Sequence, residues 1–219
     1  CNEMIAGDEK YCPRGMMAHY NVETVCTTDD PADSLEWHKI VADDPTAKTR
    51  MLPTWRPDAG MNIDAKGWPA YIEKLSSVSG VEIRNFADLV NALQIRHDFF
   101  AANGCRLSDH GPEEFYDEPY TVAEIDAIMD KALAGKEISV VEAHKFKHAY
   151  LHEQGIMDYN AGWAQQYHYG AIRNNNAKMF ASIGADTGFD SIGEFNTAKA
   201  MSRFLDELNS KGKLSKTIL

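Results

Sequence analysis

Arg56 is the first residue whose type and setting suggest chemistry. It lies in the motif W-R-P-D directly after the apolar run 50–55. Pro57 fixes its own φ and keeps the preceding residue extended. A guanidinium held in this way can bind a carboxylate or an enediolate through two parallel hydrogen bonds. The alternative is an internal salt bridge to Asp58, and the motif is compatible with both.

His168 is the second candidate, at the end of the run 163–169. An imidazole changes its charge near neutral pH, so it suits general acid–base catalysis or a hydrogen bond to a substrate oxygen. The alternative is a core histidine satisfied by a backbone carbonyl. Polar residues that end other apolar runs favour the catalytic interpretation.

Four further residues are candidates for substrate contact. Asp109 ends the run 104–109 and His110 follows it; Asp109 could instead cap the next segment, and His110 could hydrogen-bond to it. Trp55 precedes the candidate arginine. Arg173 comes before the asparagines 174–176, and because a helix needs only one N-cap, the remaining asparagines are free to contact sugar hydroxyls.

Three histidines recur at helical spacing, at His144, His148 and His152. Such spacing can bind a metal. The stretch H-K-F-K-H lacks the glutamate that follows the first histidine in zinc proteases. We therefore predict a partly solvated helix face, and no metal ligand is assigned within this chain.

Short apolar runs, rich in β-branched and aromatic residues, predict buried strands. Helix-sized stretches separate them, and strand–helix alternation predicts parallel pairing through crossovers. A doubly wound sheet and a piece of a (β/α)₈ barrel both satisfy this pattern, and in both the chemistry lies at the carboxyl ends of the strands. No glycine-rich phosphate loop follows the first run, which disfavours a dinucleotide-binding sheet. The runs are 22–28, 50–55, 104–109, 163–169 and 216–219.

Helix starts are marked by N-cap residues. Asp30 with Pro31 predicts one helix start, and three serine or threonine residues followed three positions later by glutamate predict capping boxes. Residues 121–159 are predicted to form a helical hairpin inserted between the third and fourth strands, and aromatic residues on helices are assigned to the core. The capping pairs are Thr121–Glu124, Ser139–Glu142 and Ser191–Glu194, and the core aromatics are Trp37, Phe99, Phe100, Tyr150 and Phe204.

The composition narrows the class of protein. The chain has 219 residues and a net charge of −11 without long single-sign runs, which disfavours nucleic-acid binding. No apolar run reaches the length of a membrane span, and no secretory signal is visible. The four cysteines form no C-x-x-C pair, so we predict a reducing, cytoplasmic setting, with Cys26 and Cys105 buried as small hydrophobes. The chain starts at Cys1 and ends on an apolar run, from which we expect a segment of a longer protein.

Several long motifs resemble the uronate isomerase family, and they occur in that family's order. The resemblance extends from about residue 10 to residue 219. The motifs are TTDDP (27–31), LPTWRPD (52–58), GCRLSDHG (104–111), GWAQQYHYGAIRNNN (162–176) and DTGFDSIG (186–193).

The resemblance implies an aldose–ketose isomerase of the amidohydrolase superfamily, which interconverts D-glucuronate with D-fructuronate and D-galacturonate with D-tagaturonate. It implies a distorted (β/α)₈ TIM-type barrel with helical insertions, and places Arg56 and His168 in the active site. The family binds a divalent metal, usually zinc, through an H-x-H pair on the first strand and an aspartate on the last. This chain contains no H-x-H. The resemblance therefore makes residues 1–219 a single domain that is an incomplete barrel, with its metal ligands outside this chain.

The implied chemistry suits the candidate residues. Removing a proton next to a carbonyl creates an enediolate that needs cationic stabilisation and a nearby base. Arg56 would be a clamp or stabiliser, and His168 would hold a substrate oxygen or shuttle a proton. The base could also lie outside this chain, and a hydride shift is the rival chemistry.

Two other functions are weighed against the isomerase. One is a metal-dependent hydrolase of the same superfamily, which would need histidines or a lysine for a second metal. The other is an inactive fragment or binding module. The expected partner is a small sugar acid, and a homo-oligomer is compatible with the sequence.

Overall fold

Five parallel strands lie side by side in the order in which they occur in the chain. The structure is a computed structural model that describes residues 2–219. Strand β1 pairs with β2, and β3 pairs with β4, which pairs with β7. Single bridges from Asp29 to Trp55 and from Trp55 to Ser108 connect the two groups of strands. The strands are β1 (Thr24–Cys26), β2 (Arg50–Leu52), β3 (Leu107–His110), β4 (Ala164–Tyr167) and β7 (Lys216–Ile218).

This strand order decides between the two predicted folds. A doubly wound sheet reverses its strand order part of the way along the sheet, whereas consecutive strands of a (β/α) barrel are always neighbours. The chain is thus an α/β structure that forms part of a TIM-type barrel. Each of the five predicted runs overlaps a strand. Strand β3 extends one residue past its run, to His110, and the other four strands are shorter than their runs.

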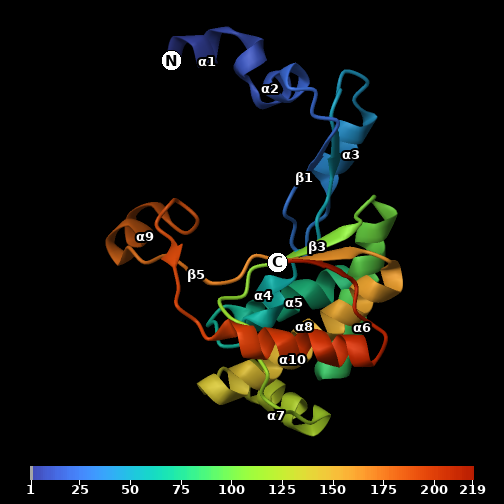
Figure 1. The fold of residues 1–219 in the computed structure, drawn as a ribbon, viewed down its shortest axis with the longest axis vertical. Helices are drawn as coiled ribbons and strands as arrows, with labels where there is room; N and C mark the ends of the chain where they lie inside the picture. The colour runs from blue at the N-terminus through green and yellow to red at the C-terminus, as the bar shows by residue number, and fades with distance from the viewer. Residues whose placement is uncertain (1) are drawn as a thin grey trace.

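Helices fill the connections between the strands, and two very short strands form a separate antiparallel hairpin. In Figure 1 the longest helices gather beside the strands in the lower body of the molecule. The helices are α1 (Asn2–Gly7), α2 (Pro13–His19), α3 (Glu36–Asp43), α4 (Asp58–Met61), α5 (Trp68–Ser79), α6 (Phe86–Ala102), α7 (Val122–Leu133), α8 (Val140–Ala161), α9 (Ala177–Ile183) and α10 (Thr197–Ser210), with a 3₁₀ turn at Glu9–Tyr11 and the hairpin strands β5 (Ala171–Ile172) and β6 (Ser191–Ile192).

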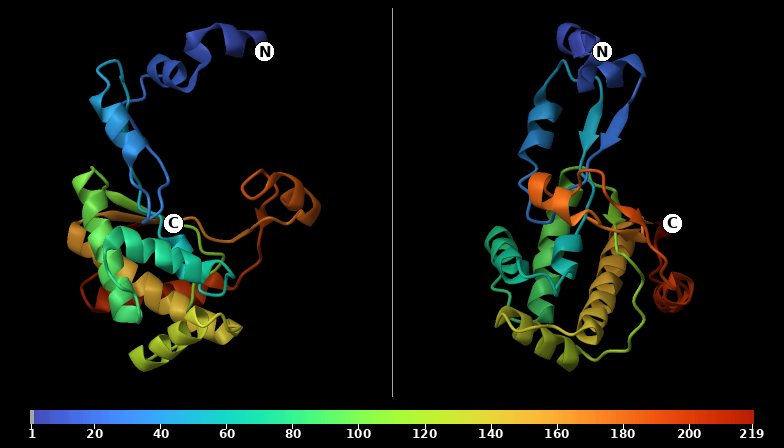
Figure 2. Two further views of the ribbon diagram at one scale, coloured as in Figure 1. Left: turned by 180° about the vertical axis from the view of Figure 1, so that it is seen from behind. Right: turned by 90° about the vertical axis from the view of Figure 1, so that its left-hand side faces the viewer.

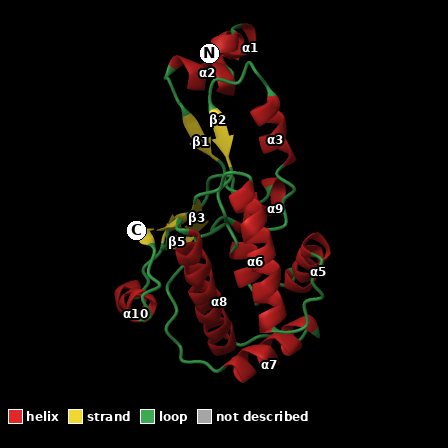
Figure 3. Ribbon diagram, turned by 90° about the vertical axis from the view of Figure 1, so that its right-hand side faces the viewer, coloured by secondary structure: helices red, strands yellow, loops and turns green. Residues whose placement is uncertain are grey.

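The apolar core lies between the strands and helices α5 to α8 and α10. Figure 3 shows α6 and α8 running side by side, with α7 across one end of the pair. Helix α8 also packs on α10, where Gly155 faces the side chain of Leu208. Phe146 on α8 and Phe204 on α10 are fully buried, as are Leu89 and Leu93 on α6. This layer holds the strands whose carboxyl ends form the candidate site.

Two segments project from this body. Figure 2 shows the N-terminal helices, β1, β2 and α3 extending from one end, and α9 with its hairpin extending from a side. Trp37 on α3 is 68% exposed, so its assignment to the core is wrong. Cys26 is also exposed, whereas Cys105 is buried as predicted; Cys1 lies outside the described residues. Trp37 and Cys26 belong to the projecting N-terminal segment, which has few neighbours to cover them.

The capping predictions have mixed outcomes. Capping boxes begin α7 at Thr121 and α8 at Ser139, as predicted. The predicted box at Ser191 is wrong, because Ser191 belongs to β6 and the next helix begins only at Thr197. A short-range pattern of this kind cannot reveal that a hairpin partner occupies the residue.

The predicted helix start at Asp30 is also wrong. Asp30 forms a turn, in which its Oδ1 accepts a hydrogen bond from the Ala32 amide at 2.8 Å. Arg96 on α6 donates to the backbone oxygens of Pro31 and Asp33, both at 2.7 Å. These long-range bonds hold the segment as a loop, and α3 begins at Glu36.

Of the three histidines of α8, His144 is partly exposed as predicted, whereas the other two are buried. His148 and His152 are only 3% and 4% exposed, because α10 covers them. His148 contacts the Glu118 carbonyl oxygen at 2.9 Å and the Glu207 carboxylate at 3.1 Å. His152 receives a hydrogen bond from Lys211 at 2.9 Å. These two histidines therefore connect α8 to α10 and its end, and the prediction of partial solvation is wrong for both. His144, His148 and His152 are called the histidine row of α8 below.

No helix in residues 2–219 combines the length and the apolar character needed to cross a membrane.

Candidate active site

A cavity of about 870 Å³ opens beside the carboxyl ends of β1 to β4. Residues that follow four different strands meet in its wall, as the parallel arrangement requires. The wall includes Asp30, Arg56, Asp58, Gly111, His168 and Arg173. Three of the predicted site residues, Arg56, His168 and Arg173, thus come together although they lie on different loops.

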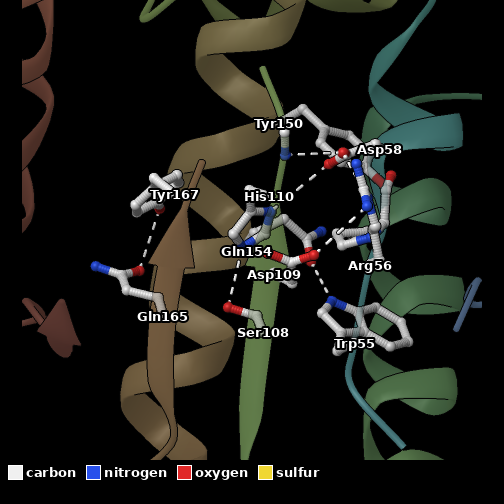
Figure 4. Close-up of polar contacts among 12 residues, drawn as sticks. Trp55, Arg56, Asp58, Ser108, Asp109, His110, Tyr150, Gln154, Gln165 and Tyr167 are labelled. Atoms are coloured by element: carbon white, nitrogen blue, oxygen red, sulfur yellow. Dashed lines mark hydrogen bonds and ion pairs between the residues drawn. The ribbon is translucent and has the colours of Figure 1, made fainter. Parts of the chain in front are cut away.

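Arg56 is held by three neighbours. Its Nε donates to Asp58 Oδ2 at 3.1 Å, and its Nη1 lies 3.5 Å from Asp109 Oδ2. Its Nη2 lies 3.1 Å from His168 Nε2. Arg56 therefore forms the internal salt bridge to Asp58 and also lines the cavity, so the two alternatives do not exclude each other. Figure 4 shows the Arg56 side chain near Asp58 and Asp109.

The contacts of His168 determine where its proton lies. A guanidinium can only donate, so His168 Nε2 accepts from Arg56 with its lone pair. The proton is then on Nδ1, which donates to Asp109 Oδ1 at 2.8 Å. The side chain is 44% exposed. A carboxylate thus fixes one tautomer of the ring and leaves the basic nitrogen on the side of the arginine, which suits a proton acceptor.

Asp109 supports both Arg56 and His168. Burial raises the pKa of Asp109, but the hydrogen bond from His168 and the positive charge of Arg56 outweigh burial and hold its pKa below the ordinary value. Asp109 therefore stays ionised and keeps its acceptor for the histidine. Its contacts to Arg56 and His168 make it a positioning group in the site.

Asp58 and Gly111 are functional candidates that sequence patterns did not identify as site residues. Asp58 Oδ2 accepts from Arg56 Nε and also from the Gly111 amide at 2.9 Å. A Cβ atom on Gly111 would lie 2.5 Å from His168 Nε2 and 2.7 Å from Arg56 Nη2. Asp58 lies in the motif W-R-P-D and Gly111 in the motif S-D-H-G. The contact between them could be expected only by placing the ends of the two neighbouring strands side by side.

Trp55 and His110 lie beneath the cavity and do not line it. Both are fully buried. Trp55 donates from Nε1 to Gln154 Oε1 at 2.8 Å (Figure 4). Successive strand residues point to opposite faces, so on β3 the side chains of Asp109 and His110 cannot both face the cavity. The structure brings Asp109 to Arg56 and His168 and places His110 on the other side.

Arg173 lines the cavity at a greater distance along the chain from β4. Its Nη1 donates to Asp190 Oδ2 at 2.6 Å. The asparagines after it have separate structural contacts: Asn174 adopts a left-handed backbone, Asn175 bonds to Ser191, and Asn176 caps α9 by accepting from the Met179 amide. The prediction that at least one of them is an N-cap is confirmed.

Lys147 is a cavity residue that sequence patterns did not identify. It lies on α8, and its Nζ is 3.0 Å from Asp64 Oδ1. Its side chain is 12% exposed. Helical periodicity cannot show that this position meets a strand-end cavity, because α8 is apolar or buried on several sides.

The donor set of the described residues does not form a metal site. Among residues 2–219, no three histidine, cysteine, aspartate or glutamate side chains gather in positions that could hold an ion.

Polar groups from successive parallel strands meet at the carboxyl ends of these strands, which is where (β/α) barrel enzymes place their active sites. The chain belongs to the glucuronate isomerase family, whose sequence model matches residues 1–219. It is 60% identical to a uronate isomerase of Phocaeicola vulgatus and 61% identical to one of Bacteroides thetaiotaomicron. Each match covers 100% of this chain and 47% of the relative, so the chain spans about half the length of these curated relatives.

Two solved structures resemble the fold. A uronate isomerase of Thermotoga maritima matches with a TM-score of 0.86 and 32% identity, over 92% of this chain and 44% of the other. A glucuronate isomerase of Caulobacter crescentus matches with a TM-score of 0.82 and 25% identity, over 92% and 42%. The family resemblance of the strand-end motifs is thereby confirmed.

Proposed function

We propose that the intact protein is a uronate isomerase that interconverts D-glucuronate with D-fructuronate and D-galacturonate with D-tagaturonate. Family membership supports this proposal. The observation that carries it is the contact between Arg56 and His168 in the cavity wall, with Asp109 bonded to the histidine. A fixed cation beside an oriented base is what aldose–ketose isomerisation requires.

Arg56 supplies the cationic part of the mechanism. When the C2 proton of the open-chain aldehyde is removed, negative charge develops on the enediolate oxygens. A guanidinium held by Asp58 and Asp109 needs little rearrangement to bind that charge or the substrate carboxylate. Its two parallel donors suit either planar group.

His168 supplies the proton transfer. Nε2 accepts the C2 proton, and the hydrogen bond from Nδ1 to Asp109 stabilises the imidazolium that forms. The imidazolium exchanges its proton with water and delivers a proton to C1, while the C2 hydroxyl proton passes to O1, so that C2 becomes the ketone and C1 a hydroxymethyl group. Substrate displaces the Nε2 contact to Arg56, because the same lone pair cannot serve both.

The other predicted site residues take supporting roles in this proposal. Asp109 positions His168, and Arg173 contacts a substrate hydroxyl from the cavity wall. Trp55 and His110 support the wall from beneath instead of contacting the substrate, because both are fully buried.

The remaining parts of the proposal concern the intact protein. A divalent metal such as zinc would be held by residues outside this chain, because the described residues do not offer a ligand set. Residues 1–219 form one domain, an incomplete barrel, in which 121–159 is a helical insertion. We also propose a cytoplasmic location, a homo-oligomer, and a small sugar acid as the substrate class.

The test is conversion of D-glucuronate and D-galacturonate by the intact protein supplied with a divalent metal, followed by NMR. We expect the two ketouronates and no conversion of D-glucose, which lacks the carboxylate. With substrate deuterated at C2, the proton-transfer route loses label to water, and a hydride shift retains all of it at C1. No ketouronate from the metal-supplied protein would overturn the proposed function.

A further inference from the structure

A line of buried polar side chains runs beneath the cavity from α6 to β3. Ser108 Oγ donates to Asp158 Oδ2 at 2.5 Å, and His97 Nε2 lies 3.2 Å from Asp158 Oδ1. His110 Nε2 lies 3.0 Å from Ser108 Oγ. All four residues are fully buried. Buried polar groups are costly unless they are satisfied, so a line of four calls for a physical explanation.

The hydrogen bonds of Ser108 show that His110 carries a proton on Nε2. Asp158 is ionised: burial raises its pKa, but its contacts with His110 and His97 outweigh burial and lower its pKa below the ordinary value. The Ser108 hydroxyl uses its only proton on this carboxylate. Ser108 Oγ must therefore accept from His110, which places a proton on His110 Nε2.

The other side of the same ring faces the active site. His110 Nδ1 lies 3.9 Å from Asp58 Oδ1, a pair marked in Figure 4. Each of these two atoms is buried without a hydrogen-bond partner among the described residues. The second oxygen of Asp58 is the one that holds Arg56 and the Gly111 amide. His110 thus stands between a carboxylate of the cavity wall and a carboxylate of the core.

We propose that His110 is a positioning residue for the isomerase reaction, which holds Asp58 and, through Asp58, the Arg56 guanidinium. A proton on Nδ1 as well as on Nε2 makes the ring a cation between Asp58 and Asp158, and satisfies an otherwise unpaired carboxylate oxygen. Arg56 then keeps its orientation when substrate displaces His168 from it. This inference rests on the proposed function for its catalytic consequence, whereas the 3.9 Å approach of His110 Nδ1 to Asp58 Oδ1 does not depend on turnover.

The surroundings of the ring favour this arrangement. The charged or titratable groups that face His110 are Asp58 from α4, Asp158 from α8 and the stacked Tyr167 from β4 at 5.0 Å between ring centroids, whereas Asp109 beside it points to the other face of β3. Burial, followed by the charges of Asp158 and Asp58, raises the pKa of Tyr167 well above the ordinary value, so this neighbour is neutral. Asp58 and Asp158, the carboxylates on the two sides of the ring, stabilise a cation here.

A double-mutant cycle in the intact protein tests the link. We expect His110→Gln and Asp58→Asn each to lower kcat/KM for D-glucuronate by about 10- to 100-fold, because a displaced catalytic group has that effect. We expect the double variant to match Asp58→Asn within about threefold, because both changes break one connection. His148→Gln is the matched control, since this histidine is equally buried and pairs with a carboxylate away from the cavity. Its kcat/KM should stay within about threefold of wild type.

Multiplied losses in the double variant would overturn the proposal, because His110 would then act independently of Asp58. Loss of kcat/KM in the control as large as in His110→Gln would also overturn it, since any buried histidine would then have the same effect.

NMR of the ¹⁵N-histidine-labelled intact protein tests the same link without turnover. We expect protons on both ring nitrogens of His110 in the wild type and loss of the Nδ1 proton in Asp58→Asn. An unprotonated Nδ1 in the wild type would contradict the inference. If the wild type converts no uronate, the proposed function fails, and this spectrum still decides whether His110 holds Asp58.

Discussion

The strand-end cavity and the histidine row of α8 contain the same kinds of side chain with opposite consequences. In the cavity wall, Arg56 and His168 contact each other and remain open to a ligand. In the row, His148 contacts Glu207 and the Glu118 carbonyl oxygen, and α10 covers it. Histidines at ligand-like spacing on one helix have structural contacts, whereas residues far apart in the chain form the site.

The difference follows from geometry. One helix face projects side chains along a single line, and each meets the nearest partner on the neighbouring helix. Carboxyl ends of parallel strands instead point side chains from several loops toward one space, which the strands themselves leave open. A charged pair at such a place remains available to a ligand.

The largest effect is expected from the cavity pair. Arg56→Met and His168→Asn should each lower kcat of the intact protein by about 10²- to 10⁴-fold, because one removes the cation and the other the proton acceptor. Steady-state kinetics measure the loss, and circular dichroism with chemical unfolding should show a retained fold. Turnover near the wild-type value would assign both residues structural roles.

A smaller loss is expected from Gly111→Ala. The added methyl would lie 2.5 Å from His168 Nε2 and 2.7 Å from Arg56 Nη2, so both side chains must move. We expect kcat/KM to fall by about 10- to 100-fold. Gly67→Ala is the control, because a Cβ there meets nothing within 4 Å. Equal kinetics in the two variants would show that the close contact at Gly111 has no role.

The row should respond in stability and not in catalysis. His148→Leu removes two hydrogen bonds from a buried position and leaves Glu207 without its partner. We expect the free energy of unfolding to fall by about 1–3 kcal/mol. Activity per folded molecule should stay within about twofold of wild type. A large loss of kcat with unchanged stability would make the row part of the site.

The smallest effect depends on pH. The folded-state pKa of Asp109 is below its ordinary value of 3.8, so its ionisation stabilises the fold above that pH and the stabilisation is lost as the pH falls through the lower, folded value. Asp109→Asn should therefore lower the free energy of unfolding by about 1–2 kcal/mol at pH 7. The difference from wild type should shrink below pH 3.8, as measured by urea unfolding from pH 7 to pH 3. A difference that does not change with pH would show that the carboxylate charge is not involved.

Much of the fold could be predicted from local pattern. Apolar runs identified all five parallel strands, and capping boxes identified the starts of α7 and α8. Strand order could not be predicted, because pairing such as β4 with β7 joins residues about 50 positions apart. For the same reason the burial of His148 was missed, since it depends on α10.

Single residues of the candidate site could be predicted from their position at the end of an apolar run. Contacts between residues of two different motifs could not. Arg56 and His168 end apolar runs, and this signal is local. The contact of Asp58 with the Gly111 amide connects two motifs, and the link of Ser108 to Asp158 connects a strand with a helix 50 residues later. No residue type or spacing within one motif indicates such contacts.

A crystal structure of the intact protein with bound D-glucuronate would test the central claim most directly. We expect the sugar acid in the strand-end cavity, with its oxygens within hydrogen-bond distance of the Arg56 guanidinium and of His168 Nε2, and no ligand at the histidine row of α8. A uronate bound elsewhere, with Arg56 still paired to His168, would contradict the claim.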